Sequence, residues 1–444
     1  MKLLIVRSSE ASTWGSCKVI SPNLQDTYKL LPENIELSWF DIPIKYIQKE
    51  INSERLIINE LANKIKTESP DQIIFIDHLP CPADILIKLS LIMELRQLPP
   101  LVFHIYGDFT YFSKDWLDLS SKIVNHPLKF ITASSSQKKL LGFFCEDSST
   151  IDQLCFPVNS EDYSFNSTDR REFRNKHNIN EGDTVILYAG RVSLQKNVDI
   201  LIQEYLNLIK NENSTVHLWV VGAFDDMGAP FMGVKTRDGY LYSKIQTILG
   251  HHPKGFTRNI KFWGRQDKDE LKKIKAASDM FISLSLYHDE DYGMSPAEAM
   301  ACGLPTLLTD WGGYSSFASK AWRCQLIPVK ITEFGLQIKT TAISEFYEAL
   351  NESYINDIDR ERWSKEFLNA FSIKNTVSKL EKIMTTPFNV FTGFNWALAP
   401  FTQIYGKTAK VNTIDANTCP SNKNFYFQVY QNYISQNNSG KDHE

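Results

Sequence analysis

Two carboxylates stand out in the stretch 287–305, which reads YHDEDYGMSPAEAMACGLP. Glu290 lies in an acidic loop, and Glu298 follows eight residues later in the first turn of a predicted helix. A carboxylate can accept hydrogen bonds from ligand hydroxyls, and the free amides at a helix N-terminus bind anions such as phosphate. The amides that would face such an anion are those of Gly293, Met294 and Ser295.

Each carboxylate also has a plainer interpretation. Ser295, Pro296 and Glu298 fit a capping box with proline at the first helical position, which would explain Glu298 without a ligand. Glu290 has no such local role. A loop carboxylate is usually only solvated, but Glu290 is the more diagnostic of the two. Residues 289–291 read DED and match a D-x-D pattern for divalent metals, but short acidic patterns are frequent by chance, and we predict no metal site.

Two cations, Arg191 and Lys196, follow the apolar segment 184–190 and precede a predicted helix over 197–210. Arginine binds a diphosphate bidentately, lysine binds it as a point charge, and a helix N-terminus adds its dipole. Taken alone, two loop cations are more often solvated surface charges. Their meaning therefore depends on what the rest of the chain places beside them.

Other predicted strands also end in residues that suit a ligand. Gly312 and Gly313 follow the strand 305–311, and two adjacent glycines permit close approach of the backbone to a ligand, although an ordinary tight turn would use them too. In the first half, two strands end in polar residues, which would meet because neighbouring parallel strands share one edge of a sheet. These residues are Asp77, His78, His104 and Asp108.

The elements that must position these residues form two series. Short apolar runs alternate with helical patterns before and after a polar stretch at 157–183, which predicts parallel sheets with crossover helices. The fold class is therefore α/β, with two Rossmann-like doubly wound domains, and 444 residues suit two cores. We predict an N-terminal domain over 1–158 and a C-terminal domain over 159–385 with an insertion at 224–258. An aromatic extension follows at 386–444, and one interpretation is that it packs back on the N-terminal domain.

Composition limits the partners. A net charge of −4 gives no reason to expect nucleic acid. Seven scattered cysteines without a CxxC pair favour neither a zinc site nor disulfides, which suggests a reducing, cytoplasmic compartment. The N-terminus is interpreted as a first strand and not a signal peptide, and no apolar run reaches the roughly 18 residues of a membrane span. Peripheral contact with the inner face of a membrane stays open.

In this order, GRVSLQK, FWGRQDKDEL, EDYGMSPAE with AMACGLP, and the later glycine pair resemble the donor half of retaining family 4 glycosyltransferases, over roughly residues 184–316. The resemblance implies the GT-B fold, in which two Rossmann-like domains face each other across a cleft. It implies a hexosyltransferase-type enzyme that moves a sugar from a nucleotide diphosphate sugar to a glycan, lipid-linked or protein acceptor, with retention of anomeric configuration. It implies neither a metal nor another cofactor.

The resemblance also implies roles for the candidate residues. Arg191 and Lys196 would grip the diphosphate, Glu290 would contact donor-sugar hydroxyls, and Glu298 would accept the ribose hydroxyls. The remaining donor-side residues would be Gly264 and Arg265 near the base, the amides of Gly293, Met294 and Ser295, and the pair Gly312 and Gly313. His104 matches the histidine near the reacting sugar, and Asp77, His78 and Asp108 would lie on the acceptor side.

Two alternatives remain beside an active transferase. Residues 7–16, RSSEASTWGS, stand where family members often carry a glycine-rich loop, which gives some support to a non-catalytic GT-B protein that binds a nucleotide sugar or a protein partner. The other alternative is a different GT-B enzyme, a phosphorylase or a sugar-nucleotide epimerase. The presence of Arg191, Lys196, Glu290 and Glu298 together favours the transferase.

Overall fold

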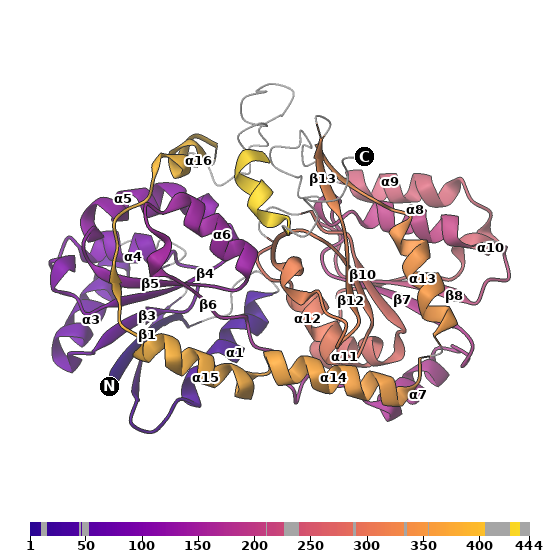
Figure 1. Cartoon of the computed structure of the whole chain (residues 1–444), viewed down its shortest axis with the longest axis horizontal. Coiled ribbons are helices and arrows are strands. Elements are labelled where there is room, and N and C mark those ends of the chain that lie inside the picture. The colour runs from indigo at the N-terminus through magenta and orange to yellow at the C-terminus, as the bar shows by residue number, and fades with distance from the viewer. Residues whose placement is uncertain are drawn as a thin grey trace. The chain divides into compact units, whose positions relative to one another are not determined.

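In its computed structural model, the protein consists of two compact units (Figure 1). Unit 1 comprises Met1–Pro157 and Ile373–Asn412, and unit 2 comprises Val158–Ser372 and Thr413–Glu444. The residues that the structure describes are 1–9, 16–43, 46, 53–209, 211–225, 239–286, 290–332, 335–353, 355–404 and 427–435.

Unit 1 is a doubly wound sheet with the strand order β2-β1-β3-β4-β5, all parallel. Both β6 and the antiparallel β15 lie on the outer edge of β5. In Figure 1 helix α5 lies above this sheet, and α1 with α15 lies below it. The elements are β1 (Lys2–Ser8), α1 (Cys17–Lys29), β2 (Glu36–Ile42), α3 (Ser53–Glu68), β3 (Gln72–Phe75), α4 (Pro82–Leu89), β4 (Leu101–Ile105), α5 (Ser113–Ile123), β5 (Pro127–Thr132), α6 (Ser135–Phe144), β6 (Ile151–Gln153), α15 (Ile373–Thr385), β15 (Asn389–Val390) and α16 (Ala399–Ile404), with the short 3-10 helices η1 (Leu95–Gln97), η2 (Gly107–Phe112), η3 (Ser148–Thr150) and η6 (Trp396–Leu398).

Unit 2 is a parallel sheet with the order β9-β8-β7-β10-β11-β12, which is the order of a dinucleotide-binding Rossmann fold. Both sheets confirm the predicted α/β class. The elements are α7 (Ser167–Lys176), β7 (Thr184–Ala189), α8 (Val198–Leu208), β8 (Val216–Val221), α9 (Tyr240–Gly250), α10 (Lys254–Thr257), β9 (Ile260–Gly264), α11 (Lys268–Ala277), β10 (Met280–Ser283), α12 (Met294–Ala301), β11 (Thr306–Thr309), β12 (Cys324–Ile327), β13 (Val329–Thr332), β14 (Gly335–Ile338), α13 (Ala342–Glu352) and α14 (Asp357–Phe371), with η4 (Leu194–Lys196), η5 (Gly312–Phe317) and η7 (Gln431–Tyr433).

Strand periodicity explains how the core of unit 1 is filled. Leu3 and Ile5 of β1 point to the same face and join a buried cluster with Tyr28 of α1 and with Leu380 and Met384 of α15. Alternate residues of β1 face the other side and are also buried, because helices cover both faces of the sheet. The apolar residues on both faces of β1 are thus buried under helices.

Helix α15 marks the largest difference from the predicted domains, which placed residues 373–385 in the second domain. The helix packs on α1 and belongs to unit 1. Two side chains of the unit 1 sheet also satisfy carbonyl groups at its C-terminal end. Gln72 Nε2 donates to the carbonyl of Met384 (2.8 Å), and Lys129 Nζ donates to that of Thr386 (2.8 Å). The chain changes unit after Pro157 and again after Ser372, and residues 427–435 belong to unit 2 once more.

Two predicted irregular regions have defined structure. Within the insertion 224–258, α9 buries Leu241 and Ile245 in the core of unit 2, so this part is not a loop; residues 226–238 lie outside the described residues. The extension 386–444 is divided between the units. Its residues 389–404 pack on unit 1, where Asn395 Nδ2 donates to the carbonyl of Phe143 (2.6 Å), while 427–435 belong to unit 2.

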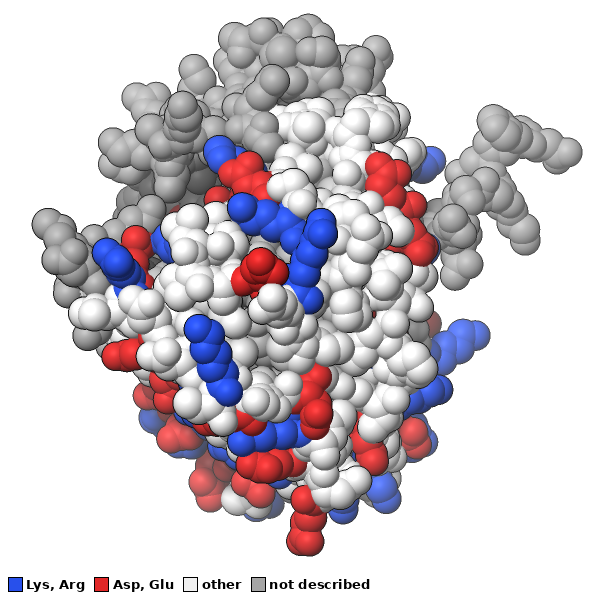
Figure 2. Space-filling view, turned by 90° about the vertical axis from the view of Figure 1, so that its left-hand side faces the viewer, with Lys and Arg blue, Asp and Glu red and all other residues white. Residues whose placement is uncertain are grey.

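Surface charge on unit 1 is mixed in sign. The face shown in Figure 2 carries basic and acidic side chains next to one another. Within unit 1, Lys88 pairs with Glu54 (2.7 Å) and Asp84 (2.8 Å). Among the described residues, no helix combines the length and the apolar character that crossing a bilayer requires.

Candidate functional site

The order of strands in unit 2 reverses between β7 and β10, and ligands of such sheets bind beyond the carboxyl ends of the strands at this point. Lys196 lies in η4 after β7, and Glu290 lies in the loop after β10. The ammonium of Lys196 and the carboxylate of Glu290 form an ion pair, with the two side chains only 13% and 9% exposed. The structure thus brings together two predicted residues from distant parts of the chain. Asp289 of the D-x-D pattern lies outside the described residues.

The Glu290 carboxylate has further partners that the sequence did not indicate. The Ser285 hydroxyl donates to it at 2.6 Å. Burial, followed by the charge of Glu290, raises the pKa of the Tyr314 hydroxyl, which also contacts Ser283 Oγ at 2.9 Å. An ammonium and the Ser285 hydroxyl therefore hold this carboxylate at the end of the central strands.

The predicted glycine pair supports the same loop. The Gly313 amide donates to the carbonyl oxygen of Glu290 (2.7 Å). A Cβ atom on Gly312 would lie 2.1 Å from that oxygen, and one on Gly313 would lie 2.3 Å from the carbonyl oxygen of Asp291. The close backbone approach that two glycines predict is therefore present, and the neighbour is the Glu290 loop itself.

Arg191 also lies in the loop after β7. Its guanidinium pairs with Asp225, which follows β8, at 2.7 Å, and both side chains are about one-third exposed. Its carbonyl accepts a hydrogen bond from the Tyr188 hydroxyl (2.6 Å). Asp225 was missed by sequence reasoning, although its position after the strand next to β7 is a signal that could have found it.

The start of α12 corrects the capping-box interpretation. The helix begins at Met294 after Gly293, whose φ of +105° favours glycine, and among the described residues no side chain caps it. The Ser295 hydroxyl instead donates to the carbonyl of Ala189 at the end of β7 (2.6 Å). Ser295 therefore fastens this helix to the central strand, which a local sequence pattern cannot reveal.

Glu298 forms a buried ion pair with Lys275 of α11, whose side chain has no exposed surface. The aromatic ring of Tyr163 lies beneath the ammonium, with its centroid 4.6 Å from Nζ. Lys275 was missed, although it falls in the buried stripe of α11 beside Ile274, where a lysine needs a partner. Glu298 is thus anchored by a charge and not by a helix cap.

Gly264 and Arg265 lie at the carboxyl end of β9, the edge strand two positions from β7. The Gly264 carbonyl accepts a hydrogen bond from the amide of Gly222 at the end of β8 (2.8 Å). The Arg265 side chain is exposed. Gly264 and Arg265 therefore lie at the same carboxyl end of the sheet as Lys196, but two strands away from it.

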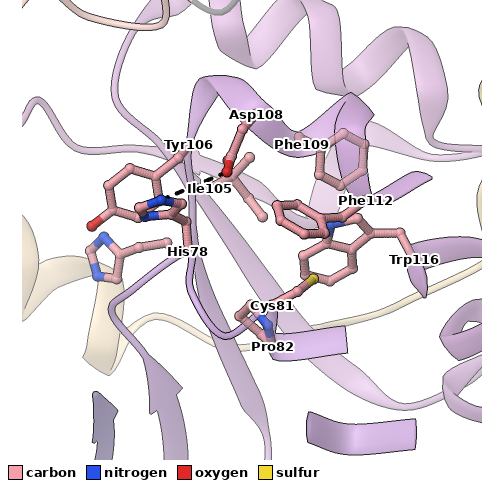
Figure 3. A pocket seen from close by; sticks show the side chains of 10 residues that line it. His78, Cys81, Pro82, Ile105, Tyr106, Asp108, Phe109, Phe112 and Trp116 are labelled. Atoms are coloured by element: carbon pink, nitrogen blue, oxygen red, sulfur yellow. Dashed lines mark ion pairs between the residues drawn. The ribbon is translucent and has the colours of Figure 1, made fainter. Parts of the chain in front are cut away.

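Unit 1 has a small cavity at the carboxyl ends of β3 and β4 (Figure 3). Its volume of about 10 Å³ suffices for one water molecule. His78 Nε2 lies 3.8 Å from Asp108 Oδ2, and burial lowers the pKa of His78 to about 4 and raises that of Asp108 to about 7. Apolar residues line the opposite side in Figure 3, namely Cys81, Pro82, Phe109, Phe112 and Trp116.

The other two unit 1 candidates have internal partners. His104 is 3% exposed, and its Nε2 lies 2.8 Å from the hydroxyl of Tyr28 in α1. Asp77 accepts a hydrogen bond from the amide of Ser8 (2.8 Å), which ties the loop after β3 to the end of β1, and burial raises the pKa of Asp77. Both side chains are therefore held by contacts within unit 1.

The burial of His104 predicts a pH effect on stability. Burial lowers its pKa to about 3 from 6.5, so below pH 6.5 the unfolded chain binds a proton that the folded chain does not. The stabilisation is complete above pH 6.5 and is lost as the pH falls toward 3, reaching a loss of about 2 kcal/mol at pH 5. His104→Gln, which keeps a partner for Tyr28, is expected to lose about 2 kcal/mol less than the wild type between pH 7 and pH 5.

The measurement is unfolding in urea at both pH values. Hydrogen exchange of peptides from β4 is the readout, because it reports on unit 1. His78 adds a pH dependence of the same sign and Asp108 one of the opposite sign, but both are shared by the two proteins. An equal pH dependence in wild type and variant would contradict the prediction.

Comparison with known proteins finds a match to a family model within unit 2. The model of the family "Glycosyl transferases group 1" matches residues 169–367. An uncharacterized glycosyltransferase of Methanocaldococcus jannaschii is 25% identical over 186 residues, which are 41% of this chain and 42% of that protein. A D-inositol 3-phosphate glycosyltransferase of Rhodococcus jostii is 28% identical over 146 residues, 33% of this chain and 29% of that protein. The matched stretches thus span less than half of these relatives.

Among solved structures, Anabaena HepE in complex with UDP and glucose superposes with a TM-score of 0.60 at 14% identity, covering 86% of this chain and 99% of HepE. At that identity the likeness concerns the fold, which extends over both units. Residues 169–367 are therefore similar to group 1 glycosyltransferases, and the chain has the GT-B fold.

Proposed function

We propose that the chain transfers a sugar from a nucleoside diphosphate sugar to an acceptor hydroxyl, with retention of anomeric configuration. The observation that carries this proposal is the Lys196–Glu290 pair at the switch point of unit 2. A diphosphate needs a cation and a sugar needs hydroxyl acceptors, and this pair offers one of each from adjacent loops. The complex of HepE with UDP and glucose supports the choice of donor class.

Donor binding would exchange one set of contacts for another. Without a ligand, Lys196 and Glu290 neutralise each other in a site that is largely buried. A donor would bring a phosphate to Lys196 and hydroxyls to Glu290, so neither charge would be left unpaired. Arg191 and the first amides of α12 would bind the other phosphate oxygens, Glu298 would accept from the ribose, and Gly264 with Arg265 would lie near the base.

The chemical step needs stabilisation of the departing diphosphate. Lys196, Arg191 and the N-terminus of α12 would supply positive potential there, and we therefore propose no metal requirement. We assign no side chain as nucleophile, so no glycosyl-enzyme intermediate is proposed. The acceptor would attack from the side of the leaving group, and a diphosphate oxygen would take its proton. His78 and Asp108 of unit 1 are the proposed acceptor-side groups. His104 is buried against Tyr28, so its proposed effect on the sugar would be indirect, through the residues that follow β4.

The test is a thermal-shift panel with UDP, GDP, ADP and their sugars on the full chain. One base is expected to raise the melting temperature selectively, because a ligand at 100 times its Kd stabilises the folded state by about 2.7 kcal/mol. The sugar nucleotide of that base is then used in a transfer assay, with the anomeric configuration of the product read by NMR. The absence of any shift would contradict the proposal, and a shift without turnover would indicate a non-catalytic binding protein.

A further inference from the structure

The C-terminal segment 427–435 is part of the wall behind the Glu290 loop. Tyr430 and Tyr433 are fully buried, and both rings pack on the buried ring of Trp311, with centroid distances of 6.4 Å and 5.5 Å. Trp311 directly precedes η5, whose first residues are the glycine pair. Two aromatic anchors therefore fix the segment to the turn that supports Glu290.

A buried carboxylate adds a polar anchor. Asp310 has no exposed surface, and it accepts hydrogen bonds from the Ser435 hydroxyl (2.6 Å) and the Ser435 amide (3.3 Å). A buried carboxylate that loses donors is costly, so release of the segment would destabilise the residues around Asp310. The segment is thus held by aromatic packing on Trp311 and by hydrogen bonds to the Asp310 carboxylate.

Gly312 connects this segment to the candidate site. A Cβ atom on Gly312 would lie 3.2 Å from Cδ2 of Tyr433 and 2.1 Å from the carbonyl oxygen of Glu290. The backbone of Gly312 is therefore enclosed between the Tyr433 ring and the Glu290 loop. A shift of the Tyr433 ring would therefore let Gly312 move and would weaken the hydrogen bond from the Gly313 amide to the Glu290 carbonyl.

We propose that Tyr433 and Ser435 are positioning residues for the donor-sugar contact of Glu290. Docking of 427–435 fixes the turn 310–313, and this turn fixes the main chain of Glu290 through the Gly313 amide. Lys196 and Ser285 then orient the Glu290 carboxylate. The inference rests on the proposed function for the role of Glu290, but the mechanical coupling does not. By linkage, if docking of the segment strengthens donor binding at Glu290, the donor strengthens docking of the segment by the same factor.

The first measurement uses no ligand. Tyr433→Ala in the full chain is expected to speed hydrogen exchange of peptides covering residues 290–316 about 5- to 10-fold, which is the lower range of coupling between sites. Peptides of unit 1 are expected to exchange as in the wild type. Gln428→Ala and Gln431→Ala, in the same segment but exposed, are the matched controls. Unchanged exchange at 290–316 overturns the inference whatever the protein binds.

The second measurement uses the nucleotide sugar that the wild type binds. Tyr433→Ala and Ser435→Ala are expected to raise the KM for this donor about 5- to 20-fold, with a smaller effect on the KM for the acceptor. Tyr433→Phe, which keeps the ring, is expected to restore donor KM to within about twofold. A donor KM that stays at the wild-type value in Tyr433→Ala overturns the positioning role. A wild type that binds no nucleotide sugar refutes the proposed function instead, which the exchange experiment distinguishes.

Discussion

Replacing Lys196 with alanine is expected to lower the rate constant of sugar transfer by about 10²- to 10³-fold, the usual effect of removing one group that stabilises charge in a transition state. Lys196 is the cation at the switch point of unit 2, and it lies within a pair that is largely shielded from water. Loss of its charge would leave the Glu290 carboxylate without its counter-ion. In the proposed function it would also leave the departing diphosphate without this cation. The measurement is single-turnover transfer with the donor that stabilises the wild type.

Lys339→Ala is the matched control for this experiment. Lys339 is also a lysine of unit 2 with a glutamate partner, Glu345 at 2.8 Å, but both side chains are more than half exposed. Exposed pairs contribute little, so activity and stability are expected to stay close to those of the wild type. Retention of more than about a tenth of the transfer rate in Lys196→Ala would remove this residue from the chemical step.

The Lys196–Glu290 contact shows what sequence reasoning can reach. The alternation of strands and helices predicted the class of sheet, and polar residues after strands marked both loops. That these loops are neighbours depends on strand order, with β10 beside β7, and the order follows from packing along the whole chain. The same applies to α15, because the apolar stripe with Leu380 and Met384 does not specify which of two similar sheets it covers.

Local patterns failed where tertiary contacts competed for the same groups. Ser295 and Glu298 have the spacing of a capping box, but the hydroxyl bonds to Ala189 and the carboxylate to Lys275. A capping interaction is worth about 1 kcal/mol, and bonds to a neighbouring strand or a buried ammonium outweigh it. The docking of 427–435 had no sequence signal beyond its aromatic content, because its anchors are Trp311 and Asp310 in a distant turn.

Lys275→Met is expected to destabilise unit 2 by about 3–5 kcal/mol, which is typical of removing one partner of a buried ion pair. Lys275 is fully buried, and its loss leaves the Glu298 carboxylate without a counter-ion beside the ring of Tyr163. Because the two units need not unfold together, hydrogen exchange of α11 and α12 peptides in urea is the suitable measurement. The control is Lys268→Met on the same helix, whose pair with Asp162 is partly exposed and is expected to contribute less than about 1 kcal/mol.

The double variant Lys275→Met/Glu298→Leu separates the two roles of Glu298. Replacing a buried ion pair with apolar residues of similar size is often neutral, so most of the lost stability is expected to return. If Glu298 also accepts the ribose hydroxyls, the double variant is expected to fold but bind the nucleotide about 10- to 100-fold more weakly, since hydrogen bonds to a charged group contribute about 1.5–3 kcal/mol. Wild-type nucleotide affinity in a stable double variant would leave Glu298 a structural role alone, and the donor site would then depend on Lys196, Arg191 and Glu290.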